Sequence, residues 1–191
     1  LSAPTEVLDP VRKGESYHVR LPYAMAACVR FTIEAEGGEV VDIRTDRFCV
    51  PGGPGDPGSY NGHRLEYVCK PGRNNFEGLF YLYGEELILQ CPNTVRVDSV
   101  GWRESGYDAD IVGRFRCGCP VTDRLVEKAA RTLYVCMRDN FMDCPDRERG
   151  QWIGDISVQA PQTFFLLDQN TRALVRKAID DFIHLRKGDV L

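Results

Sequence analysis

Hydrophobic and polar residues alternate along the first part of the chain. Residues 30–35 and residues 41–44 alternate with a period of two, which places successive side chains on opposite faces of a strand. Between them lie residues 36–39, Glu-Gly-Gly-Glu, which predict a two-glycine hairpin turn. Further strands are predicted about ten residues apart with Gly and Pro turns between them, at 65–69, 76–83, 87–90, 95–102 and 110–116. This spacing favours a β-sandwich over residues 1–117.

Residues 51–62 interrupt the series of strands. Their sequence, Pro-Gly-Gly-Pro-Gly-Asp-Pro-Gly-Ser-Tyr-Asn-Gly, suits neither a helix nor a central strand, so a long loop is predicted. Tyr60, Asn61 and His63 could contact a distal sugar there, but a plain connection between strands is the favoured interpretation. Trp102 and Tyr107, at the end of a predicted strand, are expected in the core.

The hydrophobic pattern changes to a helical one near residue 118. A first helix, with Thr122 or Asp123 as its cap, has apolar residues at spacings of three and four: Leu125, Val126, Ala129, Ala130, Leu133, Tyr134 and Met137. A second helix is predicted at about 155–168, with Pro161 as a weak point.

A third helix has Thr171 as its predicted N-cap and Gly188 as its stop signal. Its apolar stripe comprises Leu174, Val175, Ala178, Ile179, Phe182 and Ile183, and His184 beside it is expected to be half-exposed. Three helices with such wide stripes only partly cover one another. The helical part is therefore expected either to continue into a larger domain or to pack against the sheet.

Composition and charge exclude some classes of protein. The 191 residues are 43% hydrophobic and 27% charged, which is ordinary for a globular protein. The net charge of -4 and the mixing of basic with acidic residues disfavour a nucleic-acid partner. No apolar run is long enough for a transmembrane helix, so no membrane partner is expected. Residues 1–4 show no signal-peptide pattern, although a trimmed chain would look the same.

Eight cysteines are too sparse for a disulfide scaffold. Most lie in apolar strand-like or helix-like segments, so mostly reduced, buried thiols are predicted. Cys117 and Cys119 are the only closely spaced pair, and neither a second pair nor a nearby histidine completes a zinc set. With three histidines in the chain, no metal site and no cofactor are expected.

A cluster of reactive side chains lies between the first two predicted helices. Residues 138–155 contain five acids, three arginines and a tryptophan, in a connection interrupted by Pro145, Gly150 and Gly154. Glycoside hydrolysis requires two carboxyl groups, and sugar recognition uses further carboxylates and an aromatic face. The residue types fit: Asp143, Glu148, Trp152 and Asp155. The alternative is a solvated face of weak ion pairs, with Trp152 in the core and Asp155 as a helix N-cap.

Residues 143–155, Asp-Cys-Pro-x-Arg-Glu-Arg-x-x-Trp-x-Gly-Asp, resemble the signature of the bacterial α-L-rhamnosidases of glycoside hydrolase family 78. In that family a β-sandwich precedes an (α/α)₆ barrel, and the signature follows the first barrel helix. The resemblance therefore implies a β-sandwich accessory domain at residues 1–117. Residues 118–191 would be the first helices of a truncated (α/α)₆ catalytic barrel.

The resemblance also assigns roles by position. Glu148 falls on the general acid, and the positions that shape the sugar subsite correspond to Asp143, Arg147, Trp152 and Asp155. The chain departs from the pattern at Gln151, where Gly is common, and Asp143 precedes Glu148 by five positions where some members have six. The family's general base lies far downstream on another barrel helix. We therefore expect a longer gene product, and little or no activity from these 191 residues alone.

The leading hypothesis is part of an inverting glycosidase that removes terminal α-L-rhamnose from glycans or glycosides. Its expected partners are the carbohydrate substrate and the remainder of the barrel. One alternative is a non-catalytic carbohydrate-binding β-sandwich module, with sugar bound at Tyr60 or Trp102 instead of Trp152. Another is a related (α/α)₆ glycosidase with a different sugar specificity. The sequence leaves the cellular compartment open.

Overall fold

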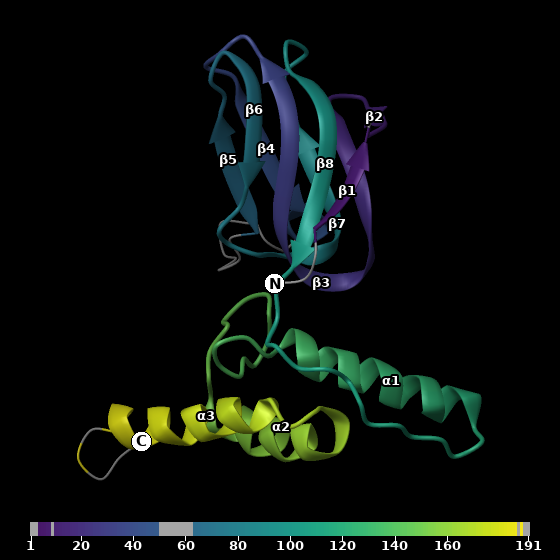
Figure 1. The fold of residues 1–191 in the computed structure, drawn as a ribbon, viewed down its shortest axis with the longest axis vertical. Coiled ribbons are helices and arrows are strands. Elements are labelled where there is room, and N and C mark those ends of the chain that lie inside the picture. The colour runs from purple at the N-terminus through teal and green to yellow at the C-terminus, as the bar shows by residue number, and fades with distance from the viewer. Residues whose placement is uncertain (1–3, 9, 50–62, 187, 189–191) are drawn as a thin grey trace. The chain divides into compact units, whose positions relative to one another are not determined.

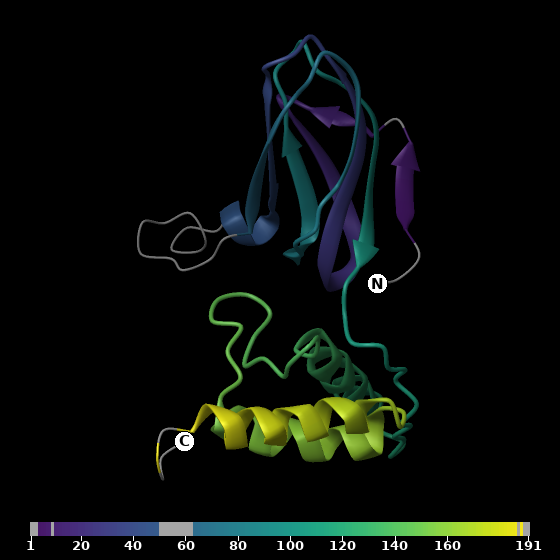
Figure 2. The same ribbon diagram turned by 60° about the vertical axis from the view of Figure 1, so that its left-hand side comes forward.

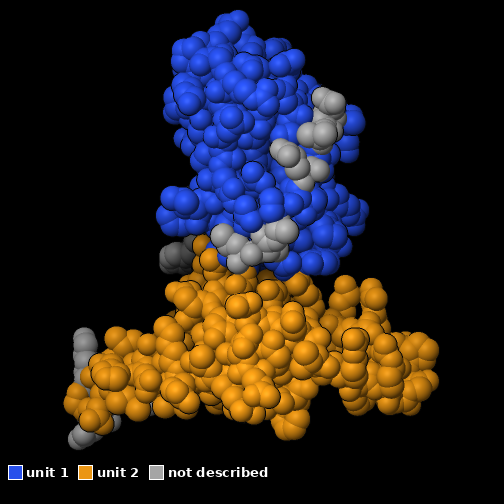
Figure 3. Space-filling view, viewed as in Figure 1, with its two compact units in different colours: residues 1–105 blue, residues 106–191 orange. Residues whose placement is uncertain are grey.

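The computed structural model describes residues 4–8, 10–49, 63–186 and 188 (Figure 1). The chain divides into two compact units, Leu1–Ser105 and Gly106–Leu191 (Figure 3). The first unit contains the strands and the second contains the helices. The loop expected at 51–62, with Tyr60 and Asn61, lies outside the described residues.

The described residues of the first unit form a single antiparallel sheet of eight strands. The strand order is β1-β8-β3-β7-β4-β5, and β2 and β6 also pair with β3. The strands are β1 (Thr5–Leu8), β2 (Arg12–Lys13), β3 (Ser16–Ala35), β4 (Val40–Thr45), β5 (Arg64–Val68), β6 (Gly72–Glu77), β7 (Leu82–Gln90) and β8 (Arg96–Glu104), and a 3-10 turn, η1 (Asp46–Cys49), follows β4.

The long strand β3 connects two groups of strands. Its first part pairs with β7 and its second part pairs with β8 and β6, with a register shift between Arg20 and Met25. A strand that bends in this way can serve two layers of a sheet. The same course of β3 is visible from a second direction (Figure 2).

Side chains from both groups of strands form one core. In β3 Val29, Phe31 and Ile33 are buried while the residues between them are partly exposed, as the alternating pattern predicted. They share one hydrophobic cluster with Ile43 of β4 and Leu89 of β7. The two groups therefore pack across a common interior, and the strand-rich character of this part of the chain is confirmed.

The two-glycine segment is a turn, but the expected hairpin is wrong. β3 and β4 are not paired with each other; β4 pairs with β5 and β7. Gly37 and Gly38 have positive φ angles of 113° and 92°, which glycine adopts without a steric penalty. At Gly37 a Cβ atom would lie 2.7 Å from the side chain of Pro71. The turn passes the chain from one group of strands to the other.

Two predicted strands are also wrong. The predicted strand at 76–83 is divided, because β6 ends at Glu77, β7 starts at Leu82, and Leu79 and Phe80 between them are exposed. The segment 110–116 is not a strand. The N–H groups of Val112 and Gly113 donate to the carbonyl of Leu166 in the second unit, at 3.0 and 2.9 Å.

The division into two compact units comes between Ser105 and Gly106. The reason is that the backbone of residues 106–117 finds its partners in the helical unit. Asp168 N–H donates to the Asp110 carbonyl at 3.1 Å, and Ile111 forms an isolated bridge with Leu167. The assignment of these two parts as accessory domain and start of a catalytic barrel stays a prediction.

The three predicted helices are present. They are α1 (Pro120–Val135), α2 (Ile153–Leu166) and α3 (Thr171–Leu185). Pro161 lies within α2 without ending it. Neither predicted cap is an N-cap: α1 starts before Asp123, whose carboxylate accepts the N–H of Cys117 at 2.8 Å, and Thr171 is the first residue of α3 itself.

The helical unit has a small core and a large exposed apolar surface. Its buried cluster comprises Leu133, Met137, Phe141, Ile156, Leu167, Leu174 and Ala178. Other apolar positions on the helices are more than half exposed: Val121, Leu125, Ile153, Val158, Phe164, Phe165, Ile179, Ile183 and Leu185. Only some of the residues in the predicted apolar stripes are therefore buried by contacts within the unit. His184 is exposed.

The cysteines whose side chains are described are all free thiols. Four are buried, as predicted: Cys28, Cys69, Cys91 and Cys136. Burial raises the pKa of Cys91 to about 12 and that of Cys136 to about 11. Within the described ranges no cluster of His, Cys, Asp and Glu could hold a metal ion. The helices described are too short or too polar to cross a membrane.

Candidate active site

The residues between α1 and α2 form a loop that Asp143 and Gly150 close. The N–H of Asp143 donates to the Gly150 carbonyl, and the N–H of Gly150 donates to Asp143 Oδ1, both at 2.9 Å. Arg149 just before the closure has a φ of 56°, in the left-handed region. Gly150 lies so close to Trp152 that a Cβ atom would be 2.8 Å from the indole nitrogen. The closed loop therefore leaves no room for a side chain at position 150.

Three of the five predicted site residues meet at Glu148. The indole Nε1–H of Trp152 donates to Glu148 Oε2 at 2.9 Å. The guanidinium of Arg147 forms an ion pair with Glu148 Oε1. Both carboxylate oxygens of Glu148 therefore have a donor, and the side chain remains 37% exposed. The sequence motif is thus a local cluster in space as well as in the chain.

Trp152 is a surface residue at the start of α2. Its side chain is 56% exposed, so the alternative that placed it in the core is wrong. It is also the N-cap residue of α2, the role that the same alternative gave to Asp155. The exposed indole is available to stack against the apolar face of a sugar ring, while its N–H fixes Glu148.

The other two predicted residues are placed differently. Asp155 is exposed in the first turn of α2. Asp143 is partly buried and uses one carboxylate oxygen to close the loop. In this structure Asp143 therefore supports the loop that carries Glu148, and its second oxygen is left for other contacts.

Two donors hold the carboxyl group of Glu148 in position, the guanidinium of Arg147 and the indole N–H of Trp152. A proton donor in glycoside hydrolysis must carry a proton at the start of the reaction. In these 191 residues the side chain of Glu148 is held in position by its neighbours and remains partly exposed to solvent.

Gln151 joins the loop to α3 and was not predicted as a site residue. Its Oε1 accepts the N–H of Phe141 and its Nε2 donates to Asp181 Oδ2, both at 3.3 Å. Lys177 donates to the same oxygen of Asp181 at 2.7 Å, and the pKa of Asp181 is lowered mainly by this bond. The only sequence signal for this role was that Gln151 stands where the resembling family commonly has Gly.

One further hydrogen bond and a group of buried side chains hold the loop in place. Gln159 of α2 donates to the Met142 carbonyl at 2.8 Å. The side chains of Met137, Phe141 and Met142 are almost fully buried. The loop therefore sits on an apolar base while its polar residues stay near the surface.

Other candidate positions are not sugar contacts. His63 is fully buried, and its Nδ1 accepts the N–H of Tyr83 at 2.9 Å, so the suggested role in touching a distal sugar is wrong. Trp102 is buried in the sheet core, as expected. Tyr107 is partly buried and donates its hydroxyl to the carbonyl of Asn170 at 3.0 Å.

Comparison with known families concerns the same part of the chain. Residues 110–189 match the model of the bacterial alpha-L-rhamnosidase six-hairpin glycosidase domain. The resemblance to bacterial α-L-rhamnosidases is confirmed. This rhamnosidase-like region includes the loop with Glu148, the three helices and the irregular segment that precedes them. A search of curated proteins finds no match.

Solved rhamnosidases share the fold of nearly the whole chain. The GH78 family rhamnosidase of Bacillus sp. GL1 is 22% identical with a TM-score of 0.72, over 94% of this chain and 19% of that one. The rhamnosidase from Klebsiella oxytoca with rhamnose bound is 14% identical with a TM-score of 0.73, over 89% and 36%. The alpha-L-rhamnosidase from Dictyoglumus thermophilum is 19% identical with a TM-score of 0.72, over 97% and 22%.

These similarities establish the fold of a strand-rich unit followed by three helices. The chain spans only 19 to 36% of the length of these solved rhamnosidases. The enzymes that it resembles are therefore much larger than the segment described by the present structure.

Proposed function

We propose that this chain is part of an inverting glycoside hydrolase that removes terminal α-L-rhamnose, with Glu148 as the proton donor. The observation that carries the proposal is the arrangement of Arg147, Glu148 and Trp152 within the region that matches the rhamnosidase family. The substrate would be a rhamnosylated glycan or glycoside, held at the exposed face of Trp152. Asp143 and Asp155 would shape the same sugar subsite.

An inverting reaction needs a second carboxylate on the opposite face of the sugar. The two carboxyl groups of inverting enzymes are roughly 6.5–9.5 Å apart, which leaves room for the attacking water. In our proposal this general base comes from a later helix of the same barrel. These 191 residues then supply the acid without the base and hydrolyse little or nothing on their own.

The helical unit supports the idea of a larger barrel. Large apolar side chains on all three helices face solvent, including Leu125 at 66%, Phe165 at 78% and Leu185 at 77% exposure. Such surfaces are normally buried against another element. Further barrel helices would cover them, and the same packing would enclose the loop that carries Glu148.

Enclosure is also what the proton donor requires. Burial disfavours the charged form of a carboxyl group, and nearby carboxylates act in the same direction. In our proposal both effects act on Glu148 once further barrel helices surround it. We therefore expect Glu148 to act as the proton donor only in the complete barrel.

The test is hydrolysis of p-nitrophenyl α-L-rhamnopyranoside by the 191-residue chain and by the product of its full open reading frame. Activity of the longer product alone is the expected result. In that protein Glu148→Gln should reduce kcat by about 10²–10⁴-fold, because Gln cannot donate the proton. Unchanged activity of this variant would remove Glu148 from the mechanism. The anomer first released, followed by NMR, tests inversion.

Specificity for a different sugar is the closest alternative. The exposed Trp152 would stack on many pyranoses, and a shared fold does not fix the substrate. A panel of nitrophenyl glycosides decides between the two, with hydrolysis of a glucoside or mannoside in place of the rhamnoside assigning the site to another glycosidase. Two variants serve as controls. Glu148→Asp keeps the carboxyl group but changes its position, and Asp146→Asn removes one charge from the loop.

A further inference from the structure

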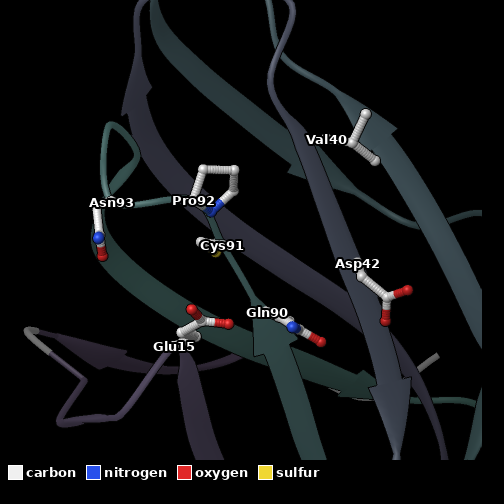
Figure 4. Close-up of a pocket in the computed structure, with 7 residues that line it drawn as sticks. All are labelled: Glu15, Val40, Asp42, Gln90, Cys91, Pro92 and Asn93. Atoms are coloured by element: carbon white, nitrogen blue, oxygen red, sulfur yellow. The ribbon is translucent and has the colours of Figure 1, made fainter.

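A cavity of about 390 Å³ lies in the strand unit, and the residues that line it lie outside the range 110–189. It is formed where Glu15, just before β3, meets the end of β7 and the start of β4 (Figure 4). Its volume falls in the range of ligand sites, roughly 300–1,000 Å³. The described residues that line it all belong to the first compact unit.

Two side-chain amides in the cavity are oriented by arginines. Arg44 donates to Gln90 Oε1 at 2.9 Å, and Arg12 donates to Asn93 Oδ1 at 2.8 Å. Because both amide oxygens already accept a bond, each amide has its NH₂ group left as a hydrogen-bond donor. Arg12 also donates to the carbonyl of Cys91 at 3.1 Å, which anchors it to the end of β7.

Hydrogen-bond acceptors line the same cavity as these donors. The carboxylates of Glu15 and Asp42 line the same cavity, and Gln90 lies between them in the close-up (Figure 4). Within the described residues the side chain of Glu15 makes no hydrogen bond or ion pair. Val40 and Pro92 complete the wall with apolar surface. The cavity thus offers donors, acceptors and a small apolar wall.

This combination disfavours ions as ligands. An anion would meet the carboxylates of Glu15 and Asp42. A cation would compete with the arginines, because Asp42 already pairs with Arg64 and lies 3.7 Å from Arg44 Nε. A hydroxyl group, in contrast, both donates and accepts a hydrogen bond. The lining therefore suits a neutral molecule with several hydroxyl groups.

We propose that this cavity is a second, non-catalytic binding site for a sugar residue of a glycan. Glu15 and Asp42 accept hydrogen bonds from the sugar hydroxyls, Gln90 and Asn93 donate to them, and Pro92 contacts the C–H face. Because Glu15 and Asn93 are exposed, we expect only weak binding of a single sugar, with a Kd on the order of 1 mM. Such a site would hold a glycan on the enzyme independently of its cleavage.

The test is an NMR titration of the ¹⁵N-labelled 191-residue chain with L-rhamnose, methyl α-L-rhamnoside, D-glucose and D-galactose. Saturable shifts of the side-chain NH₂ signals of Gln90 and Asn93 with at least one sugar are the expected result. No shift with any of them well above a millimolar concentration would overturn the proposal. The same shifts with Ca²⁺, inorganic phosphate or glycerol would also overturn it, since the cavity would then not select a sugar.

Variants place the binding in the cavity. Glu15→Ala should weaken it by about tenfold and Asn93→Ala by about two- to tenfold, which matches the loss of one hydrogen bond each. Glu85→Ala is the matched control, because Glu85 is an exposed acid near the other end of β7. Equal binding by Glu15→Ala and Glu85→Ala would contradict the proposal.

Glu148→Gln and Trp152→Ala separate this inference from the proposed catalytic function. Neither variant should change the shifts of Gln90 and Asn93. Sugar-dependent shifts confined to the Trp152 indole N–H would support the candidate active site and overturn the cavity site.

Discussion

The two units of this chain differ in how completely they bury their own apolar surface. The strand unit places residues from both of its groups of strands in one cluster, where Val29, Ile43 and Leu89 are fully buried. The helical unit has a smaller cluster around Phe141 and Leu174, and leaves one side of each helix exposed. The strand unit therefore has a well-buried core, whereas much of the apolar surface of the helical unit stays exposed.

This difference separates stability from function. The strand unit forms its core from its own residues. The helical unit carries the predicted catalytic loop but exposes the surfaces that would hold that loop in a closed site. The proposed proton donor Glu148 is thus held in position by its neighbours, while much of the apolar surface of the same unit stays exposed.

Core substitutions should show the largest contrast. Leu89→Ala should lower the free energy of unfolding of the strand unit by about 2–5 kcal/mol, because the dense sheet core cannot collapse around the cavity. Leu174→Ala should cost the helical unit less, since its few neighbours can relax. Urea denaturation followed by Trp102 fluorescence and by helical circular dichroism measures the two. Leu79→Ala and Leu185→Ala, both at exposed positions, are the controls, and equal costs for the core variants would contradict the comparison.

The second largest difference between the two units should be the reactivity of their cysteine thiols. Cys117 and Cys119 are exposed, and the pKa of Cys119 is lowered by hydrogen bonds from Thr122 and the first turn of α1. Cys91 in the sheet is buried with a pKa of about 12. In the native chain at pH 7–8, iodoacetamide should modify Cys119 more than about tenfold faster than Cys91. Peptide mass spectrometry reads this out, and early labelling of Cys91 would show that the sheet opens readily.

Gln151→Ala should destabilise the loop between α1 and α2 by about 0.5–1.5 kcal/mol, because both hydrogen bonds of the Gln151 side chain are lost. The N–H of Phe141 should then exchange faster with deuterium, while the sheet amides do not change. Gln162→Ala, an exposed glutamine of α2, is the matched control. Unchanged exchange at Phe141 would show that α3 does not hold this loop.

The smallest effect concerns acid stability. Lys177, with help from Gln151, lowers the pKa of Asp181, and Arg103 and Arg30 lower that of Glu77 in the sheet. A depressed folded-state pKa gives stability that is present above the unfolded value and is lost as the pH falls through the folded value. Asp181→Asn should therefore flatten the acid-side loss of helix stability, and Glu77→Gln that of the sheet. Urea midpoints between pH 3 and pH 7, roughly the range over which carboxyl groups titrate, measure both. Steeper acid dependence in either variant would contradict the assignment.

Much of the fold and site was readable from local patterns. The alternation at residues 30–35 and 41–44, the three helical stripes and the motif at 143–155 all report interactions between neighbours in sequence. Trp152 and Glu148, which contact each other, are only four residues apart in the sequence. Gln151 was missed as a structural link because its partner Asp181 lies on a different helix.

The errors have a common physical origin. The segment 36–39 has the glycines of a hairpin, but whether β4 pairs with β3 depends on where β7 and β5 lie. Residues 110–116 look like a strand, but their N–H groups bond to the end of α2 instead of to a sheet. A local pattern specifies the conformation that a segment favours, and its hydrogen-bond partner is chosen by distant residues.

The sequence by itself determined the order of a strand-rich part, three helices and a rhamnosidase-like motif, since periodicity and motif spacing are local properties. Only the tertiary structure decided that β3 serves two groups of strands, that the helical unit starts at Gly106, and that Arg147 and Trp152 both contact the carboxyl group of Glu148. It also brought Glu15, Asp42, Gln90 and Asn93 together around one cavity. Each of these depends on contacts between residues that the sequence alone does not pair.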